Sequence, residues 1–599
     1  MKVSTTPIIY PPNADESIAD LLLERRDRDP KAPMLEVAGP AGVEPVSAGA
    51  FVDAVEGLAK GFIAAGVKHG DTLGIMGRTC EQWTRVDYAL WYIGAAGVPV
   101  YETSSEAQAA WIVRDSGMVG AVAETAAHAA ILRASLTGQI WVMEEGALAH
   151  LTESGKAVPD AVLQARRSAV RGADLATVIY TSGTTGRPKG VELSHLSFTT
   201  MARNTATALD FIVCPGSRGL LFLPLAHVFA RVINVIALHS PAVMAYSPDT
   251  KNLVADLGLY KPTFLLVVPR VLEKVYNAAE ASTGGGFKLR VFRWAAKVAI
   301  VSSRELDSRG GFTPVRRVQH ALARRLVYRK LTKMMGGALT QAVSGGAPLG
   351  ERLGHFFRGI GLTVYEGYGL TETTAPTAVN RAGLNKLGTV GQPLPGQSVA
   401  IAQDGEILVR GYHVFRGYRG NAAATSEVFE DGWFRTGDIG SLDSDGCLAI
   451  TARRKELIVT ASGKNVAPGV LEDRLRGHPL VSQVVVVGEG RPFVGALITL
   501  DDEMIPAWLA NHGKSPLTLD QARIDPDIHA SLARAVARTN EVVSRAESIR
   551  EFRVLDADFT EANGYLTPSL KVKRDQVLRD FAAEVDALYA DAAARRAAS

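Results

Sequence analysis

Residues 180–190 read YTSGTTGRPKG, and this stretch decides how the rest of the chain is interpreted. An apolar run at 176–180 precedes it and gives way to hydroxyls, glycines and two cations. Glycines let backbone N–H groups turn toward an anion, hydroxyls donate hydrogen bonds, and Lys189 adds a point charge. A polar surface turn shares this composition, but the combination favours a loop that holds phosphate.

A Walker loop is the first alternative for such a stretch. It requires the spacing G-x-x-x-x-G-K-[ST]. Counting from Gly183 puts Pro188 where the second glycine should stand. The stretch is therefore a different kind of phosphate loop.

Composition indicates a large globular protein. The 599 residues exceed one ordinary domain, and 47% are hydrophobic against 21% charged. A net charge of +3 is small for this length, so we expect no nucleic-acid partner. Cys80, Cys214 and Cys447 are odd in number and lack C-x-x-C spacing, which favours a reducing cytosol over disulfides or a zinc site.

Neither a signal peptide nor a membrane span is expected. Residues 1–17 lack a sufficiently long apolar core. The most apolar region, 219–246, is interrupted by prolines and polar residues, whereas a span needs about 20 mostly apolar residues. We interpret 219–246 as a buried strand followed by a buried helix.

Helical and strand patterns alternate along most of the chain. Helical spacing occurs at 51–65, 81–96 and 196–208, and short β-rich runs occur at 72–76, 98–101, 140–143, 219–223, 242–246 and 263–268. Such alternation predicts an α/β fold with largely parallel sheets. Near Thr451 a strand-like segment meets a charged ARRKE segment, and we place a domain boundary there, giving domains 1–451 and 452–599.

Four further motifs follow in order: QAVSGGAPL (341–349), YEGYGLTE (365–372), GEILVRG (405–411) and DGWFRTGDIG (431–440). Together with TSGTTGRPKG they resemble the core motifs of the adenylate-forming superfamily, over roughly residues 45–590. The resemblance implies a large N-terminal domain of layered α/β subdomains with a small β-barrel-like part. It also implies a smaller, mobile C-terminal α+β domain.

The resemblance also implies an ATP site. The β- and γ-phosphates would be held by Thr181, Ser182, Gly183, Thr184, Thr185, Gly186 and Lys189. The adenine pocket would comprise Gly345, Gly346, Ala347, Glu366, Gly367 and Tyr368, with Tyr368 stacked on the base. Thr371 would contact the α-phosphate, and Mg²⁺ would be held by Glu372 and Thr184.

Asp438 in RTGD resembles the aspartate that accepts hydrogen bonds from both ribose hydroxyls, and Arg453 resembles the second ribose contact. In isolation a TGD sequence is more often a turn or helix cap. Lys455 falls at the hinge position about which the C-terminal domain of the family rotates.

The sequence PSLKVKR (568–574) narrows the resemblance from the superfamily to one subfamily. It matches P-x-G-K-[IV]-x-R except for Leu570 in place of glycine, a departure usual in long-chain fatty acyl-CoA synthetases (AMP-forming), the bacterial FadD-like group. Lys571 would be the catalytic lysine, since a mobile ammonium can bridge the charge that develops during attack on phosphorus. His227, in LPLAHVFAR, would gate the acyl pocket, although a lone histidine in an apolar run is more often a core residue.

The implied activity is activation of medium- or long-chain fatty acids by ATP to acyl-AMP, followed by transfer to CoA. One alternative is a fatty acyl-AMP ligase that passes the acyl group to a carrier protein. Another is a catalytically silent lipid-binding protein, which would require a broken motif. Lys189, Glu372, Asp438, Arg453 and Lys571 are all present, and we recognise no insertion near the domain interface that would block CoA, so we favour the CoA ligase.

Residues 287–333 carry thirteen Lys/Arg against two acids. Apolar residues keep near-helical spacing there: Val315, Val318, Leu322 and Leu326. The segment reads as a basic amphipathic helix. It is either a solvated helical face or a surface attracted to an anionic membrane, where each basic residue contributes about 1 kcal/mol. The cysteine pattern and the lack of a signal peptide or membrane span lead us to expect a cytoplasmic protein. The basic segment adds a sharper hypothesis, which is peripheral association at the inner membrane face.

Overall fold

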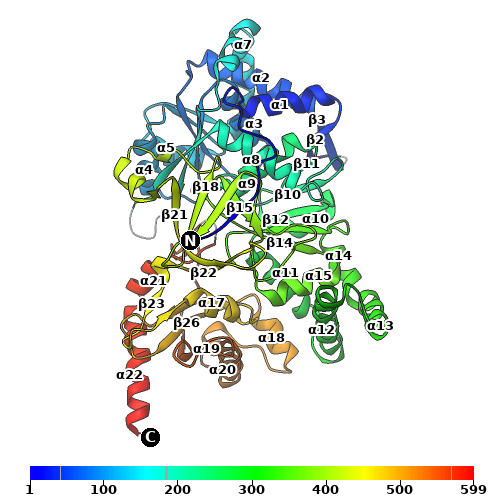
Figure 1. Cartoon of the computed structure of the whole chain (residues 1–599), viewed down its shortest axis with the longest axis vertical. Helices are drawn as coiled ribbons and strands as arrows, with labels where there is room; N and C mark the ends of the chain where they lie inside the picture. Colours follow the sequence, from blue (N-terminus) through cyan, green and yellow to red (C-terminus); the bar gives the residue numbers. More distant parts are fainter. Residues whose placement is uncertain (41, 182–186, 568–569, 599) are drawn as a thin grey trace.

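The computed structural model describes residues 1–40, 42–181, 187–567 and 570–598 (Figure 1). Three sheets build the first three quarters of the chain, and two small sheets with six helices build the rest. The α/β class predicted from the alternation of patterns is confirmed, because the two largest sheets have parallel centres.

The seven-stranded sheet has the order β19-β9-β8-β5-β4-β6-β7. Its parallel strands are β4 (Thr72–Met76), β5 (Ala96–Val100), β6 (Gly120–Ala123), β7 (Gln139–Val142) and β8 (Leu175–Thr181). Antiparallel β9 (Lys189–Ser194) and β19 (Gly417–Tyr418) complete one edge. Both faces of β4 and β5 are buried, as expected for parallel strands between helical layers.

Six helices accompany this sheet: α2 (Ala48–Ala64), α3 (Glu81–Tyr92), α4 (Glu106–Ser116), α5 (Ala126–Arg133), α6 (Ala147–Gly155) and α7 (Asp160–Ala169). The predicted helix over 81–96 was too long. It ends at Tyr92, because Gly94 takes a positive φ of 75° that reverses the chain, and Ala96 already belongs to β5.

The nine-stranded sheet has the order β16-β15-β14-β13-β12-β10-β11-β2-β3. Its strands are β2 (Pro33–Gly39), β3 (Gly42–Ser47), β10 (Arg218–Leu221), β11 (Val243–Tyr246), β12 (Phe264–Val267), β13 (Gln341–Ser344), β14 (Thr363–Leu370), β15 (Ala375–Val379) and β16 (Gln392–Pro393). Associated helices are α1 (Ile18–Arg28), α8 (His195–Ala208), α9 (Val228–His239), α10 (Leu253–Tyr260), α11 (Pro269–Ala281) and α15 (Glu351–Ile360). The buried strand and helix expected in 219–246 are β10 and α9.

A buried ion pair joins the two large sheets. Arg231 of α9 donates from Nε to Asp87 Oδ2 of α3 at 2.7 Å, and their side chains are only 1% and 3% exposed. The Arg231 guanidinium also donates to the hydroxyl of Thr177 in β8. Its carbon lies 5.1 Å from the Trp91 ring centroid, an added cation–π contact. These contacts hold α9, whose N-terminus reaches the pocket described below.

A six-stranded antiparallel sheet occupies the place expected for the barrel-like part. It contains β1 (Lys2–Thr5), β17 (Gln397–Ile401), β18 (Glu406–Gly411), β20 (Phe429–Glu430), β21 (Trp433–Leu442) and β22 (Leu448–Arg453), with α16 (Ala422–Glu427) nearby in sequence. Strand β22 pairs with β21 as far as Arg453, opposite Asp438. The expected 451/452 boundary therefore falls within β22, and we propose that the two parts meet at the 3-10 turn Arg454–Glu456.

The C-terminal part contains a two-stranded and a three-stranded sheet. Their strands are β23 (Ile458–Val459), β24 (Asn465–Val466), β25 (Val481–Val487), β26 (Val494–Leu500) and β27 (Ile549–Val554). The helices are α17 (Pro468–Arg476), α18 (Ile505–Asn511), α19 (Leu519–Ile524), α20 (Pro526–Asn540), α21 (Arg574–Asp580) and α22 (Ala582–Ala598). Every residue of β25 and β26 is buried, so this part has its own core.

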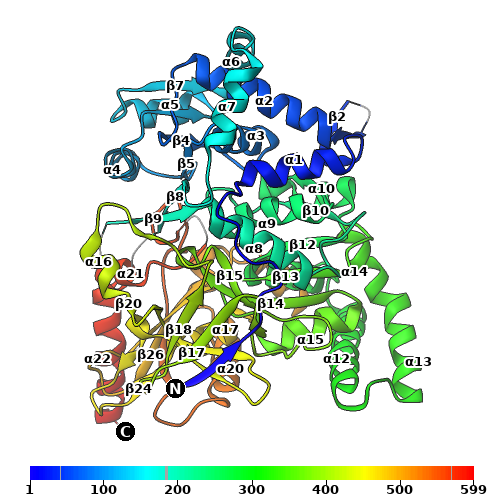
Figure 2. The ribbon, with the colours of Figure 1, turned by 45° about the horizontal axis from the view of Figure 1, so that its top comes forward.

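The basic segment 287–333 is not one helix. It forms α12 (Gly286–Arg309), α13 (Pro314–Ala323), the π-helical turn η3 (Arg324–Tyr328) and α14 (Arg329–Met334). In Figures 1 and 2, α12 and α13 lie side by side at the edge of the molecule opposite α22. Within the described part of the chain, no helix is long and apolar enough to cross a membrane.

Candidate active site

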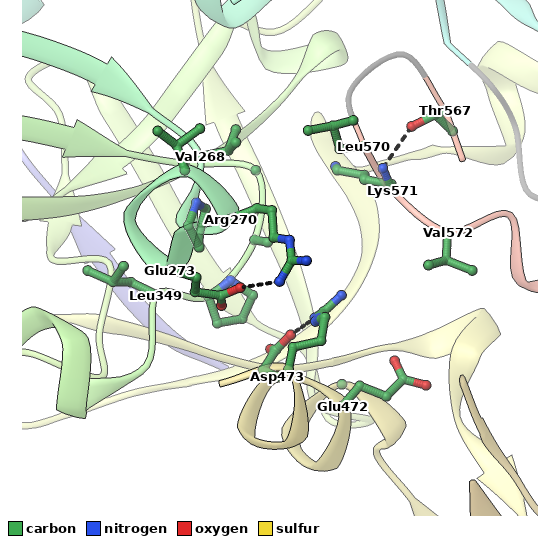
Figure 3. A pocket seen from close by; sticks show the side chains of 18 of the residues that line it. Val268, Arg270, Glu273, Leu349, Glu472, Asp473, Thr567, Leu570, Lys571 and Val572 are labelled. Atoms are coloured by element: carbon green, nitrogen blue, oxygen red, sulfur yellow. Dashed lines mark hydrogen bonds and ion pairs between the residues drawn. The ribbon is translucent and has the colours of Figure 1, made fainter. Parts of the chain in front are cut away.

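A pocket of about 3270 Å³ lies between the N-terminal sheets and the C-terminal part. Figure 3 shows Lys571 and Leu570 on a C-terminal loop, facing Val268 and Arg270 on the N-terminal side. All the described residues expected at the site line this pocket: Thr181, Lys189, His227, Gly345, Gly346, Ala347, Glu366, Gly367, Tyr368, Thr371, Glu372, Asp438, Arg453, Lys455 and Lys571. Segments far apart in sequence thus meet at one place.

The phosphate-loop sequence joins β8 to β9, and Thr181 pairs with Lys189 across the two strands. Five residues expected to bind phosphate lie outside the described residues: Ser182, Gly183, Thr184, Thr185 and Gly186. The end of the loop is anchored by Trp111, whose indole N–H donates to the Pro188 carbonyl at 2.8 Å and whose ring lies 4.8 Å from the Arg187 guanidinium carbon. The Lys189 ammonium lies 4.7 Å from the ring centroid of Tyr418.

Thr371 and Glu372 form the 3-10 turn after β14. Glu372 Oε1 accepts a 3.0 Å hydrogen bond from the Tyr418 hydroxyl. Burial raises the pKa of Glu372, so a cation at this carboxylate would favour its charged form. Among the described residues no three His, Cys, Asp or Glu gather to hold a metal. Glu372 therefore fits a Mg²⁺ ion that takes most of its oxygen ligands from phosphate and water.

The segment expected to form the adenine pocket follows β13. Gly345 lies against Phe229 of α9, so closely that an added Cβ would stand 3.1 Å from the ring. Glu366 is 7% exposed, and its carboxylate accepts from the Leu349 N–H at 3.1 Å. Glu366 thus ties the end of the 345–349 segment to β14. Gly367 and Tyr368 continue β14 along the pocket.

Asp438 lies on β21 beside the end of β22 and is buried. One carboxylate oxygen accepts from the Tyr368 hydroxyl at 2.7 Å, and the other accepts from Arg453 Nε at 2.9 Å. Each oxygen of a carboxylate can accept a second bond. Asp438 therefore keeps the capacity to receive a vicinal diol, and Arg453 and Tyr368 fix its orientation.

Lys571 reaches the pocket from the C-terminal part. The backbone N–H of Lys571 donates to the Thr567 hydroxyl at 3.1 Å, and the Thr567 backbone N–H donates to the Lys571 carbonyl at 2.8 Å (Figure 3). Leu570 has a φ of +61°, a left-handed conformation that glycine adopts freely and leucine does not. Desolvation in the pocket lowers the pKa of Lys571, and the charge of Arg453 lowers it further.

His227 is the residue that precedes α9, and its Nδ1 accepts the Phe229 N–H at 3.2 Å. The proton of the neutral ring is therefore on Nε2. Burial lowers the pKa of His227 to about 4, and the charge of Lys571 contributes in the same direction. His227 lines the pocket as a neutral hydrogen-bond donor rather than as a core residue.

Lys455 is exposed in the 3-10 turn Arg454–Glu456, between the last N-terminal strand and the first C-terminal one. Three residues that support the site were not expected from the sequence: Tyr418, Trp111 and Glu406, which accepts from the Gly437 N–H at 2.9 Å. Of these three, only Glu406 lies within a motif recognised in the sequence, GEILVRG. Tyr418 lies in a short segment flanked by glycines, directly after Gly417.

Family models match almost the whole chain. The AMP-binding enzyme model matches residues 24–419, and the AMP-binding enzyme C-terminal domain model matches residues 455–593. The long-chain-fatty-acid–CoA ligase FadD15 of Mycobacterium bovis is 45% identical over 599 residues, covering 98% of this chain and 100% of that protein. The peroxisomal long chain acyl-CoA synthetase 7 of Arabidopsis thaliana is 28% identical and covers 90% of this chain and 88% of its own.

Solved structures share the fold at low sequence identity. The anthranilate CoA ligase AuaEII in complex with anthranoyl-AMP has a TM-score of 0.71 at 17% identity and covers 97% of this chain and 99% of its own. A fatty acyl CoA synthetase of Mycobacterium tuberculosis has a TM-score of 0.61 at 20% identity, with coverages of 95% and 99%. The resemblance drawn from the motifs is confirmed: the chain belongs to the AMP-binding enzyme family of adenylate-forming enzymes.

Proposed function

We propose that this protein is an AMP-forming long-chain fatty acid–CoA ligase. A fatty acid and ATP give acyl-AMP and pyrophosphate, and CoA then displaces AMP to give acyl-CoA. One observation carries the proposal: Lys571 of the C-terminal part lines the same pocket as Glu372, Asp438 and His227 of the N-terminal part. The curated relatives named above as long-chain CoA ligases and synthetases support the choice of substrate class.

The described side chains divide the first half-reaction among them. Asp438, held by Tyr368 and Arg453, would receive the ribose hydroxyls. Glu372, with Thr184 as its proposed partner, would hold the Mg²⁺ that neutralises the phosphates. Thr181 and Lys189 would hold the leaving pyrophosphate, and Thr371 would contact the α-phosphate. Lys571 would donate toward the oxygens that gain charge as the fatty acid carboxylate attacks the α-phosphorus and the bond to pyrophosphate breaks.

His227 would orient the fatty acid. Its Nε2–H is available because Nδ1 is already used as the acceptor of a backbone N–H. A neutral donor can hydrogen-bond a carboxylate or an acyl carbonyl without neutralising the nucleophile, and its low pKa keeps it neutral near pH 7. We assign it this orienting role at the acyl entrance.

The second half-reaction needs a different surface in the pocket, because the CoA sulfur must reach the acyl carbonyl while AMP leaves. Rotation of the C-terminal part about Lys455 would withdraw Lys571 and open that approach. The position of Lys455 in the turn that joins β22 to β23 supports this role.

Separate assays of the two half-reactions test the proposal. Lys571→Ala should reduce acyl-AMP formation, measured as pyrophosphate release, by about 100-fold or more, while conversion of supplied acyl-AMP to acyl-CoA continues. Lys573→Ala is the matched control, because Lys573 is a second lysine in the same loop. Equal loss of both half-reactions in Lys571→Ala would contradict the role.

The choice of acceptor is tested with the wild-type protein. Incubation with palmitate, ATP and CoA should give the thioester. Accumulation of acyl-AMP without thioester would favour transfer to a carrier protein, and absence of pyrophosphate release would favour a silent lipid-binding protein.

A lipid-soluble substrate also supports contact with a membrane surface. The surplus of basic residues in 287–333 would attract anionic lipid electrostatically, at the inner face of the membrane.

A further inference from the structure

The outer face of the α12–α14 segment exposes an apolar row. Val315, Val318 and Leu322 follow the i, i+3, i+7 spacing of one helix face and are 69%, 70% and 49% exposed. Leu326, in the π-helical turn that follows, is 45% exposed. We call these four residues the α13 stripe. An amphipathic helix ordinarily turns its apolar side toward the core, so this orientation indicates an external partner.

The inward side of the same segment is already satisfied. Ala323, Tyr328 and Leu331 are buried in the core cluster that includes α12. The Tyr328 hydroxyl donates to the Ala295 carbonyl of α12 at 2.7 Å, and His320 Nε2 lies 2.8 Å from the Gly359 carbonyl. The hairpin is thus fixed to the protein without using the α13 stripe.

Exposed basic residues accompany the α13 stripe along α13, the π-helical turn and α14, and we call them the basic rim. Its exposed members are Arg317, Arg324, Arg325, Arg329, Lys330 and Lys333. The sequence contains no Asp or Glu between residues 308 and 350. The two acids just before this interval already have partners: Glu305 accepts from Arg316 Nε at 3.3 Å, and Asp307 accepts from Arg358 at 2.5 Å. The rim therefore keeps its full positive charge.

Charge complementarity selects the partner. A second copy that docked through the same face would bring two positive rims together, which disfavours a symmetric dimer. A bilayer with anionic lipids offers both an apolar layer for the stripe and phosphates for the rim. α13 also stands at the edge of the molecule in both views, where a flat surface can reach it (Figures 1 and 2).

We propose that the α13 stripe inserts into the surface of an anionic lipid bilayer while the basic rim contacts the lipid phosphates. This goes beyond electrostatic attraction, since it assigns the contact to three apolar side chains of α13 and one of the π-helical turn that follows it. Insertion would bring the enzyme to fatty acids dissolved in the bilayer, and this use rests on the proposed function. The binding of the stripe to the bilayer does not depend on that function.

Sedimentation of the full chain with vesicles tests the proposal. The probes are phosphatidylcholine vesicles with and without phosphatidylglycerol, at low and physiological salt. The stripe variant is Val315→Ser/Val318→Ser/Leu322→Ser, and the rim variant is Arg317→Gln/Arg324→Gln/Arg325→Gln. Matched controls are Ile524→Ser, which changes a 79% exposed apolar residue on α19, and Arg114→Gln/Arg133→Gln, which changes exposed arginines on α4 and α5.

The wild type should bind the anionic vesicles and not the neutral ones. The stripe variant should bind at least about tenfold more weakly at physiological salt, because insertion of the apolar side chains is lost. The rim variant should also bind more weakly and with less dependence on salt. Both controls should bind like the wild type.

Three results would overturn the proposal: no binding by the wild type, undiminished binding by the stripe variant, or a dimer in sedimentation velocity that the stripe variant alone dissociates. Circular dichroism and pyrophosphate release with octanoate, both without vesicles, should be unchanged in every variant. If the wild type releases no pyrophosphate with octanoate, that result would contradict the proposed function but not the proposed membrane contact.

Discussion

The Tyr418 hydroxyl donates a 3.0 Å hydrogen bond to Glu372, while the ring of the same tyrosine lies 4.7 Å from the Lys189 ammonium. One side chain thus connects the lysine of the proposed phosphate loop with the carboxylate proposed to hold Mg²⁺. Tyr418 comes from β19, the short edge strand that pairs with β9. The relative position of two motifs far apart in sequence therefore depends on a residue outside both.

Tyr418→Phe should raise the Mg²⁺ and ATP concentrations needed for half-maximal acyl-AMP formation. A hydrogen bond to a charged group contributes about 1.5–3 kcal/mol, so an increase of about tenfold or more is expected. Pyrophosphate release measured against Mg²⁺ and ATP tests this. Tyr412→Phe is the control, because Tyr412 is 51% exposed. An unchanged Mg²⁺ requirement would separate Tyr418 from the metal site.

Acyl-AMP formation should fall on the alkaline side at a pH below the ordinary lysine pKa of 10.5. The pKa of Lys571 is lowered, so its required ammonium form is lost as the pH rises through that lowered value. Lys571→Arg should react more slowly but lose this alkaline limb, since guanidinium stays charged. A pH profile of kcat/KM for ATP measures both effects. If Lys571→Arg shows the same alkaline fall in kcat/KM as the wild type, that fall is due to another group.

The left-handed conformation at Leu570 makes a graded series informative. Leu570→Gly and Leu570→Asn tolerate a positive φ and should keep acyl-AMP formation within about threefold of wild type. A β-branched residue is strained there, so Leu570→Val should displace Lys571 and slow this step about tenfold or more. Pyrophosphate release measures the series. Thioester formation from supplied acyl-AMP should not change in any member.

The Arg231–Asp87 pair should contribute to stability chiefly through the cost of breaking it. Arg231→Met leaves a buried carboxylate unpaired and should lower the free energy of unfolding by about 3–5 kcal/mol. Arg231→Met/Asp87→Leu should recover part of that loss. Urea denaturation measures each variant. As a control, Arg419→Met breaks a more exposed pair with Glu192 and should cost less than about 1 kcal/mol.

The expected elements were mostly correct where the local pattern was strong. The strand at 72–76 was predicted with its observed limits, because five consecutive residues are buried between layers of helices. The end of α3 was predicted wrongly, because Gly94 and the first residues of β5 are apolar or small and continue the helical spacing. Local patterns do not distinguish a chain reversal from helix in such a run.

The same limit applies to the basic segment. Its charge surplus and its apolar spacing were evident in the sequence. The sequence did not show in which direction Val315, Val318 and Leu322 face, because that direction depends on which side of α13 packs against α12. That choice is made by Ala323 and Tyr328.

By itself the sequence determined the family, the α/β class and the order of the site motifs, since each depends on residue types at fixed spacing. Only the tertiary structure decided that Lys571 meets Asp438 in one pocket, that Tyr418 joins Lys189 to Glu372, and that His227 lines the pocket as a neutral donor. The first two are relationships between segments that lie 46 to 229 residues apart in the sequence. Their free energies arise from packing and desolvation, which no local window of sequence contains.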